Sequence, residues 1–230
     1  PPARAPWARV DHGVARAALA ADPWEARAMQ GLDPQADVVV LGSGLTAIDI
    51  VQGLRRAGHA GRIRMVSRNG RLPLPHAVPG EAALAMPLDA FRGGPGAVLA
   101  ALRRAARERA ASGQGWQGAL DAVRPHVTAI WRAWTPAQRR RFMRHARPMW
   151  EIHRHRAPRA VLAEIERQLA VGTLVLERGE VVGLLPRPDG AMDVAVRAPT
   201  GAVQPHRAAR ILDRKSTRLN SSHANISYAV

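Results

Sequence analysis

The sequence has 230 residues, of which 47% are hydrophobic, and its net charge of +16 comes almost entirely from arginine. This hydrophobic fraction is typical of a chain with a buried core and excludes a wholly disordered protein. No apolar run approaches the roughly 18–20 residues that a helix needs to cross a bilayer, so we predict no membrane segment. The chain has no cysteine, which excludes disulfides and thiolate metal sites and fits a cytoplasmic location.

The strong positive charge has two interpretations. A basic chain can bind nucleic acid or a phosphorylated ligand. Here, however, the arginines are spread over several segments, without a tight basic cluster that alternates with aromatic residues. The sequence therefore disfavours a nucleic-acid partner and leaves a solvated arginine-rich surface as the simpler interpretation.

The two ends of the chain differ from its middle. Residues 1–35 are punctuated by proline and tryptophan, and we interpret them as a connector that lies on another domain of a longer protein. Residues 213–230 contain the only lysine and the only tyrosine, and their "DRKSTRLNSSH" resembles the translation of a common sequencing adapter. We interpret 213–230 as a non-native tail that contributes to neither fold nor function.

The first predicted elements form a strand–helix–strand unit. "DVVVLG" at 37–42 is a short β-branched run that ends in glycine, which is typical of a buried parallel strand. Apolar residues recur at helical spacing over 45–57, and Gly58 is suited to end that helix. "RIRMVSR" at 62–68 is the next predicted strand. This order predicts a βαβ unit that opens an α/β, Rossmann-like dinucleotide-binding domain over 36–212.

The remainder of that domain is predicted to contain an all-helical insertion at about 83–156 and a β-meander. A loop over 71–80 precedes the insertion, and a helix over 158–170 follows it. Further predicted elements are helical pieces near 97–111, 116–134 and 136–146, a third parallel strand at 173–178, three alternating strands between 180 and 208, and a last strand at 210–212.

Between the first strand and the first helix lies the pattern G-x-G-x-x-A, at Gly42-Ser43-Gly44-Leu45-Thr46-Ala47. The first glycine permits a tight turn, the second lets a pyrophosphate approach the backbone, and the small Ala47 lets the helix pack close to the strand. The first N–H groups of the helix would hold the phosphates, and Thr46 could add a hydroxyl contact. We predict a dinucleotide site here, while a purely structural glycine turn remains the alternative.

The end of the second strand bears on which dinucleotide is bound. NAD sites usually have an acidic residue there for the ribose hydroxyls, whereas this strand ends in Ser67 and Arg68. Arg68 can pair with a 2′-phosphate, and Ser67 can donate to the same group. The pattern favours NADP(H), although Arg68 can also be one more exposed arginine.

The placed motifs resemble a family of FAD- and NAD(P)H-binding flavoproteins that includes FAD-dependent urate hydroxylase and monooxygenases that hydroxylate the amine of aspartate. The matching stretches are "DPW" at 22–24, "VVVLGSGLTAID" at 38–49, "GHAGRIRMVSRNGRLPLPH" at 58–76, "VRPH" at 123–126 and "RRRFMRHARPMWEIHRHRAP" at 139–158. The resemblance implies that the chain is the NADPH-binding part of an FAD-dependent oxidoreductase, in which FAD is held by another domain of the same chain.

By the same resemblance, Gly42, Ser43, Gly44, Leu45 and Thr46 form the pyrophosphate turn, and Ser67 and Arg68 form the 2′-phosphate end. The implied chemistry is hydride transfer from NADPH to FAD, followed by oxygenation of a small-molecule substrate. No catalytic side chain can be identified in this sequence. Two other functions stay open: a flavoprotein reductase that does not activate oxygen, and an arginine-rich module that binds nucleic acid or protein.

Three further features have ordinary structural interpretations. His153 and His155 lie two residues apart, but no acidic or cysteine ligands stand at metal-binding spacing, so we predict no metal site. His76 could line the nicotinamide pocket by resemblance, or be a loop histidine. The tryptophans between 116 and 150 are expected to pack the helical insertion.

Overall fold

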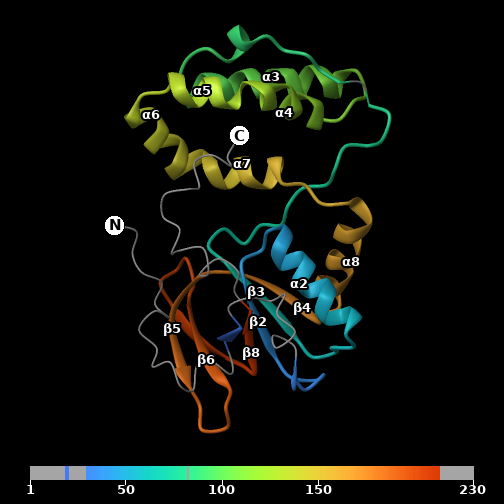
Figure 1. Ribbon diagram of the computed structural model, residues 1–230, viewed down its shortest axis with the longest axis vertical. Helices are drawn as coiled ribbons and strands as arrows, with labels where there is room; N and C mark the ends of the chain where they lie inside the picture. Colours follow the sequence, from blue (N-terminus) through green and yellow to red (C-terminus); the bar gives the residue numbers. More distant parts are fainter. Residues whose placement is uncertain (1–18, 21–29, 82, 213–230) are drawn as a thin grey trace. The chain divides into compact units, whose positions relative to one another are not determined.

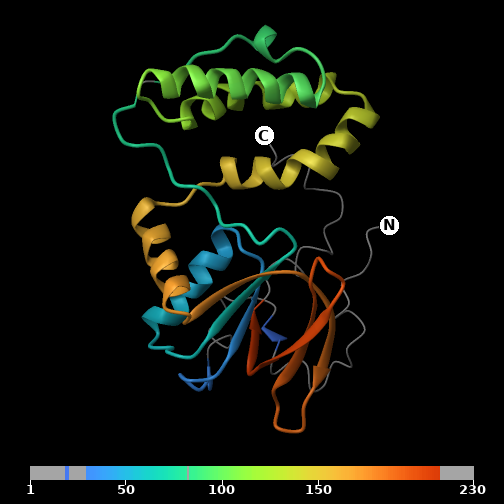
Figure 2. The same cartoon turned by 180° about the vertical axis from the view of Figure 1, so that it is seen from behind.

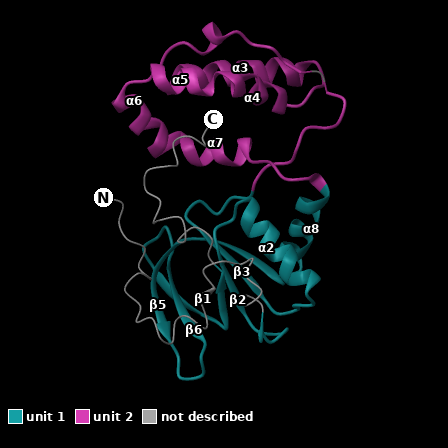
Figure 3. Ribbon diagram, in the orientation of Figure 1, with its two compact units in different colours: residues 1–72, 160–223 teal, residues 73–159, 224–230 magenta. Residues whose placement is uncertain are grey.

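The computed structural model describes residues 19–20, 30–81 and 83–212 (Figure 1). These residues form two compact units. The first is built from the chain up to residue 72 and from residue 160 onward, and the second from residues 73–159 (Figure 3).

The first unit contains a parallel five-stranded sheet in the order β1-β8-β2-β3-β4. Its strands are β1 (Leu19–Ala20), β2 (Val38–Leu41), β3 (Ile63–Ser67), β4 (Leu174–Arg178) and β8 (Arg210–Leu212). From β2 the chain adds β3 and β4 on one side and then places β8 on the other. The sheet order therefore reverses beside β2, as in Rossmann-like folds, and confirms the predicted fold class.

The central strands are buried on both faces, which explains the continuous apolar run at β2. Helices α2 (Leu45–Arg56) and α8 (Arg159–Ala170) lie on one face of the sheet, and the β-meander lies on the other (Figures 1 and 2). The meander consists of β5 (Glu180–Pro186), β6 (Met192–Arg197) and β7 (Val203–Ala208), paired antiparallel. Alternate residues of β6 point inward and pack with residues of the parallel sheet, including Val39 and Ile211.

The second unit is helical. Its elements are η3 (Leu88–Phe91), α3 (Pro95–Ala111), α4 (Gln117–Val123), η4 (Arg124–His126), α5 (Val127–Ala133), α6 (Pro136–Arg141), the π-helical segment η5 (Phe142–Ala146) and α7 (Arg147–Arg154). Phe91, Leu102, Leu120 and Trp134 are among its buried core residues. Trp116, Trp131 and Trp150 pack against the same core, which confirms that the tryptophans serve packing.

Two helix predictions in this unit were wrong in detail. The helix expected over 116–134 is divided by a 3₁₀ turn at Pro125, a residue that lacks the N–H an α-helix would use. The helix expected to end at 146 continues to Arg154 through η5. There the Arg147 N–H bonds the carbonyl of Phe142, and this wider turn precedes Pro148, whose ring would clash within a regular α-helix.

The predictions for the two chain ends stay predictions. Within the expected connector, Leu19–Ala20 pair with β8 as a short parallel strand. Residues 1–18 and 21–29 of that segment lie outside the described residues, as does the whole predicted tail at 213–230.

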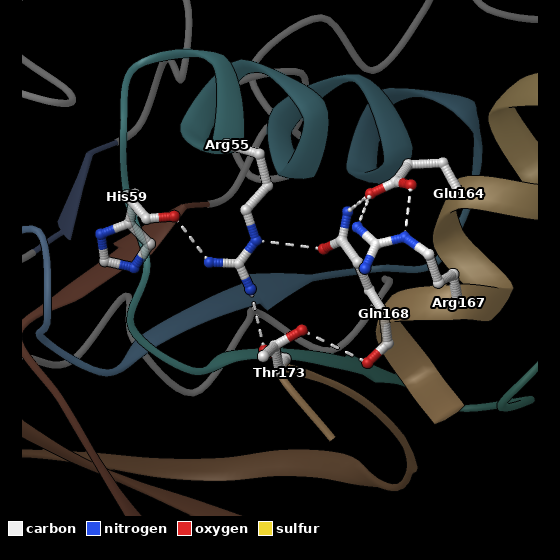
Figure 4. Close-up of polar contacts among 6 residues, drawn as sticks. All are labelled: Arg55, His59, Glu164, Arg167, Gln168 and Thr173. Carbon is white, nitrogen blue, oxygen red and sulfur yellow. Dashed lines mark hydrogen bonds and ion pairs between the residues drawn. The ribbon is translucent and has the colours of Figure 1, made fainter. Parts of the chain in front are cut away.

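Arg55, near the end of α2, ties this helix to the starts of β3 and β4 (Figure 4). Its guanidinium donates to the carbonyls of His59 (2.7 Å), Gly61 (2.8 Å) and Thr173 (2.9 Å). It also donates to the side-chain oxygen of Gln168 on α8, at 3.1 Å. One side chain therefore fixes the C-terminal end of α2 against two loops and the neighbouring helix.

We expect Arg55→Met to lower the free energy of unfolding by about 1–3 kcal/mol, because several carbonyls lose their donor. Arg56→Met is the matched control: Arg56 is exposed and bonds only the Gln52 side chain among the described residues, so its loss should cost less than about 0.5 kcal/mol. Urea denaturation of both variants measures the difference. Equal costs would contradict the anchoring role of Arg55.

His59 makes the stability of the first unit dependent on pH. The side chain is 5% exposed, and burial together with the neighbouring Arg55 lowers the pKa of His59 below 6.5, against the opposing charges of Asp33 and Asp37. The unfolded chain therefore binds a proton at a higher pH than the folded chain. The contribution of His59 is complete above about pH 6.5 and is lost as the pH falls below that value.

Denaturation of the wild type and of His59→Leu at about pH 7.5 and about pH 5 tests this effect. The wild type should lose more stability between the two conditions than the variant does. An identical loss in both would show that His59 does not contribute.

Candidate dinucleotide site at the glycine turn

The site begins where β2 ends. The N–H of Gly42 donates to the carbonyl of Val66 at 2.8 Å, so the backbone pairing of β2 with β3 continues one residue beyond the strand. Gly42 has a φ of +110°, a conformation that residues with a Cβ rarely adopt. The sharp exit from the sheet therefore requires glycine at this position.

Gly44 has a different reason to be glycine. It is the N-cap of α2, with a φ of −81° and a ψ of −172°, which any residue can adopt. A Cβ built on Gly44 would meet no atom within 4 Å. Neither backbone strain nor packing within the described residues explains this glycine. The open, exposed space above it is the approach that a pyrophosphate needs, and to this extent the turn fits a dinucleotide.

The N-terminus of α2 provides the electrostatics of the site. The first intrahelical bond joins the Ile48 N–H to the Gly44 carbonyl at 3.1 Å, so the preceding turn presents N–H groups without a helical acceptor. No acidic residue lies in this turn. Leu45 and Thr46 are half-buried, and Ala47 is buried against the sheet. The partial positive charge at the helix start is therefore available to an anion.

Ser43 and Ser67 join the ends of β2 and β3 through their hydroxyl groups. The Ser43 hydroxyl donates to the Arg71 carbonyl at 2.6 Å, and the two Oγ atoms lie 2.8 Å apart. Since Ser43 has only one proton, the hydroxyl of Ser67 must be the donor between them. Ser67 in turn accepts from the Gly70 N–H at 3.1 Å.

These hydrogen bonds change the role predicted for Ser67, which was to donate to a 2′-phosphate. Its single proton is committed to Ser43, so in this arrangement it has none to donate to a 2′-phosphate. Its oxygen and the carbonyl of Arg71 instead hold the loop after β3 against the glycine turn. Sequence reasoning missed the Arg71 carbonyl; the "NG" turn at 69–70 signals that the chain folds back there but not which acceptor it brings.

Arg68 follows β3 directly and is exposed. Within the described part of the chain, no hydrogen bond or ion pair engages its guanidinium. Because β3 is the parallel neighbour of β2, Arg68 leaves the sheet at the same edge as the glycine turn. The structure thus brings the two predicted halves of the site to one edge of the sheet.

The other predicted candidates lie in the helical unit. The Nδ1 atom of His153 lies 2.7 Å from the Met149 carbonyl oxygen. His155 lies 3.2 Å from the carboxylate of Glu151, and the hydrogen bond from His155 is the main cause that lowers the pKa of Glu151 to about 2. No group of three or more His, Asp or Glu residues suited to a metal occurs among the described residues. His76 pairs with Ala157 through its backbone N–H, and its proposed place beside a nicotinamide stays a prediction.

In the part of the chain that the structure describes, no helix has the length and apolarity to span a membrane.

No protein-family model and no curated protein matches the sequence. Among solved structures, an ornithine N-hydroxylase from Kutzneria sp. 744 is 14% identical, with a TM-score of 0.46 over 86% of this chain and 41% of its own. A cadaverine monooxygenase from Erwinia amylovora, solved with FAD, is 12% identical, with a TM-score of 0.49 over 78% and 35%. A lysine monooxygenase from Nocardia farcinica is 17% identical, with a TM-score of 0.41 over 84% and 34%.

The chain thus spans less than half the length of each of these enzymes. Identities and TM-scores this low do not assign a function. The glycine turn is therefore assigned as a candidate dinucleotide site on the geometry of this chain alone.

The two glycines of the turn should respond differently to alanine. Gly44→Ala should leave the free energy of unfolding within about 0.5 kcal/mol of the wild type but weaken NADPH binding at least tenfold, because its methyl group occupies the phosphate approach. Gly42→Ala should cost about 1–2 kcal/mol of stability, because alanine is strained at this φ. Denaturation and isothermal titration calorimetry measure both quantities. A destabilised Gly44→Ala variant that binds NADPH normally would identify a purely structural turn.

Proposed function

We propose that the chain is the NADPH-binding part of an FAD-dependent oxidoreductase, one that passes hydride from NADPH to FAD. The observation that carries the NADPH-binding claim is the glycine turn at the point where the strand order reverses beside β2. In open α/β sheets, ligands bind outside the carboxyl ends of the strands at such a point.

The residues of the turn would hold the pyrophosphate. Gly44 admits it close to the backbone, and the N–H groups at the start of α2 donate to its oxygens. Arg68 pairs with the 2′-phosphate, since it is exposed, uncommitted among the described residues and at the same sheet edge. Ser43 and Ser67 position these groups by joining the two strand ends.

The flavin half of the proposal has a different basis. It rests on the sequence motifs that resemble FAD- and NAD(P)H-binding monooxygenases, chiefly "GSGLTAID" at 42–49 and "SRNGRLPLPH" at 67–76. NADPH supplies the hydride when bound, and this chain orients the cofactor towards FAD held by another domain of the same protein. A small-molecule substrate and a cytoplasmic location belong to the same proposal. Oxygen consumption by the whole protein with NADPH distinguishes a monooxygenase from a reductase that does not activate oxygen.

Arg68→Gln tests the choice of dinucleotide. Losing one charge-assisted contact of about 1.5–3 kcal/mol should raise the Kd for NADPH by about 10- to 150-fold and leave the Kd for NADH nearly unchanged. Arg62→Gln is the matched control, because Arg62 is also exposed and lies just before the opposite end of β3.

Calorimetric titration of both variants with both dinucleotides separates the outcomes. A loss restricted to Arg68→Gln and to NADPH supports the assignment. Equal losses for NADPH and NADH would contradict a contact with the 2′-phosphate, and no loss at all would place Arg68 outside the site.

A further inference from the structure

A second basic feature lies in the helical unit, far along the sequence from the glycine turn. Between Asp121 and Glu151 the chain contains no acidic residue and seven arginines. The densest part is "RRRFMRHAR" at 139–147, which covers the end of α6, the π-helical segment η5 and the start of α7.

This segment forms a shallow hollow of about 270 Å³, lined by Ala137, Arg140, Arg141, Arg144 and His145. The spacing of these residues repeats every three or four positions, so their side chains share one face of the helix. The small Ala137 leaves room between the long basic side chains. All five residues are exposed.

The arginines around the hollow differ in how they are engaged. Arg139 donates to the carbonyls of Trp131 and Arg132, and Arg147 pairs with Glu151. Among the described residues, by contrast, no hydrogen bond or ion pair engages the side chains of Arg140, Arg141 or Arg144. Three guanidinium groups therefore share one helix face with no counter-charge among the described residues.

Such an arrangement disfavours the helix unless an anion neutralises it. Arg140 and Arg144 lie four residues apart, and like charges at this spacing repel. Guanidinium groups match phosphate oxygens through paired N–H donors. The hollow is smaller than the usual 300–1,000 Å³ of a pocket for a whole drug-sized ligand, so it suits the phosphate part of a ligand.

The nearby aromatic residues argue against recognition of bases. Trp131, Trp134, Phe142 and Trp150 all belong to the packed core of this unit and are not exposed beside the arginines. Nucleic-acid surfaces that bind single strands combine basic grooves with aromatic side chains on which bases stack. Here no exposed aromatic side chain among these four lies beside the arginines, which favours contact with phosphoryl groups only.

We propose that the hollow formed by Arg140, Arg141, Arg144 and His145 is a binding site for pyrophosphate groups, separate from the glycine turn. The ligand class is a compact polyanion with two or more linked phosphates, either free or as part of a nucleotide. This site does not depend on the function proposed for the turn.

The test is titration of the ¹⁵N-labelled 230-residue chain with inorganic pyrophosphate, with amide signals followed residue by residue. We expect the largest shifts at residues 137–145. Arg140→Gln/Arg144→Gln should weaken binding at this site at least tenfold. Arg103→Gln/Arg107→Gln is the control: it removes the same charge from two exposed positions four residues apart on α3, so binding should stay within about twofold.

A steric variant keeps the test valid if the charge variant folds poorly. Ala137→Leu fills the hollow without changing charge and should also weaken binding at least tenfold. Parallel titrations with ADP identify the source: tighter binding of ADP indicates a nucleotide ligand, and equal binding indicates free pyrophosphate. Equal losses in the α3 control, or shifts confined to residues 42–47, would overturn the proposal. So would binding of a random single-stranded oligonucleotide without any pyrophosphate effect.

Discussion

The geometry of the proposed site depends on the backbone of Gly42. Its φ of +110° turns the chain out of β2 while its N–H still pairs with Val66 in β3. Helix α2 therefore starts directly at the carboxyl edge of the sheet. Its other end is held by Arg55, which bonds three loop carbonyls and Gln168. Because the helix is fixed at both ends, its first N–H groups and their partial positive charge have a defined place above the sheet.

The hydrogen bonds from Ser67 through Ser43 to the Arg71 carbonyl also fix the end of the neighbouring strand β3. It joins the turn that would hold a pyrophosphate to the strand end that carries Arg68. Binding costs less when the contact groups are already ordered, so this coupling favours a pre-formed site. Ser67 is accordingly a positioning residue, and Arg68 is the side chain that would distinguish NADPH from NADH.

Much of the first unit could be predicted from the sequence, because its signals are local. The β-branched run at β2, the helical spacing from Leu45 and the glycine turn between them each indicate one conformation. The Ser43–Ser67 contact and the anchoring by Arg55 could not be predicted, since they join residues that are distant in sequence and depend on loop geometry. The π-helical segment was also missed: Pro148 indicates a break, whereas the wider turn lets the helix continue to Arg154.

The central claim is that this chain holds NADPH at the glycine turn. A crystal structure of the chain grown with NADPH tests it most directly. We expect the pyrophosphate to lie over Gly44 at the start of α2, with the 2′-phosphate within hydrogen-bonding distance of Arg68. Well-ordered NADPH elsewhere on the chain, or an empty turn at saturating NADPH, would contradict it.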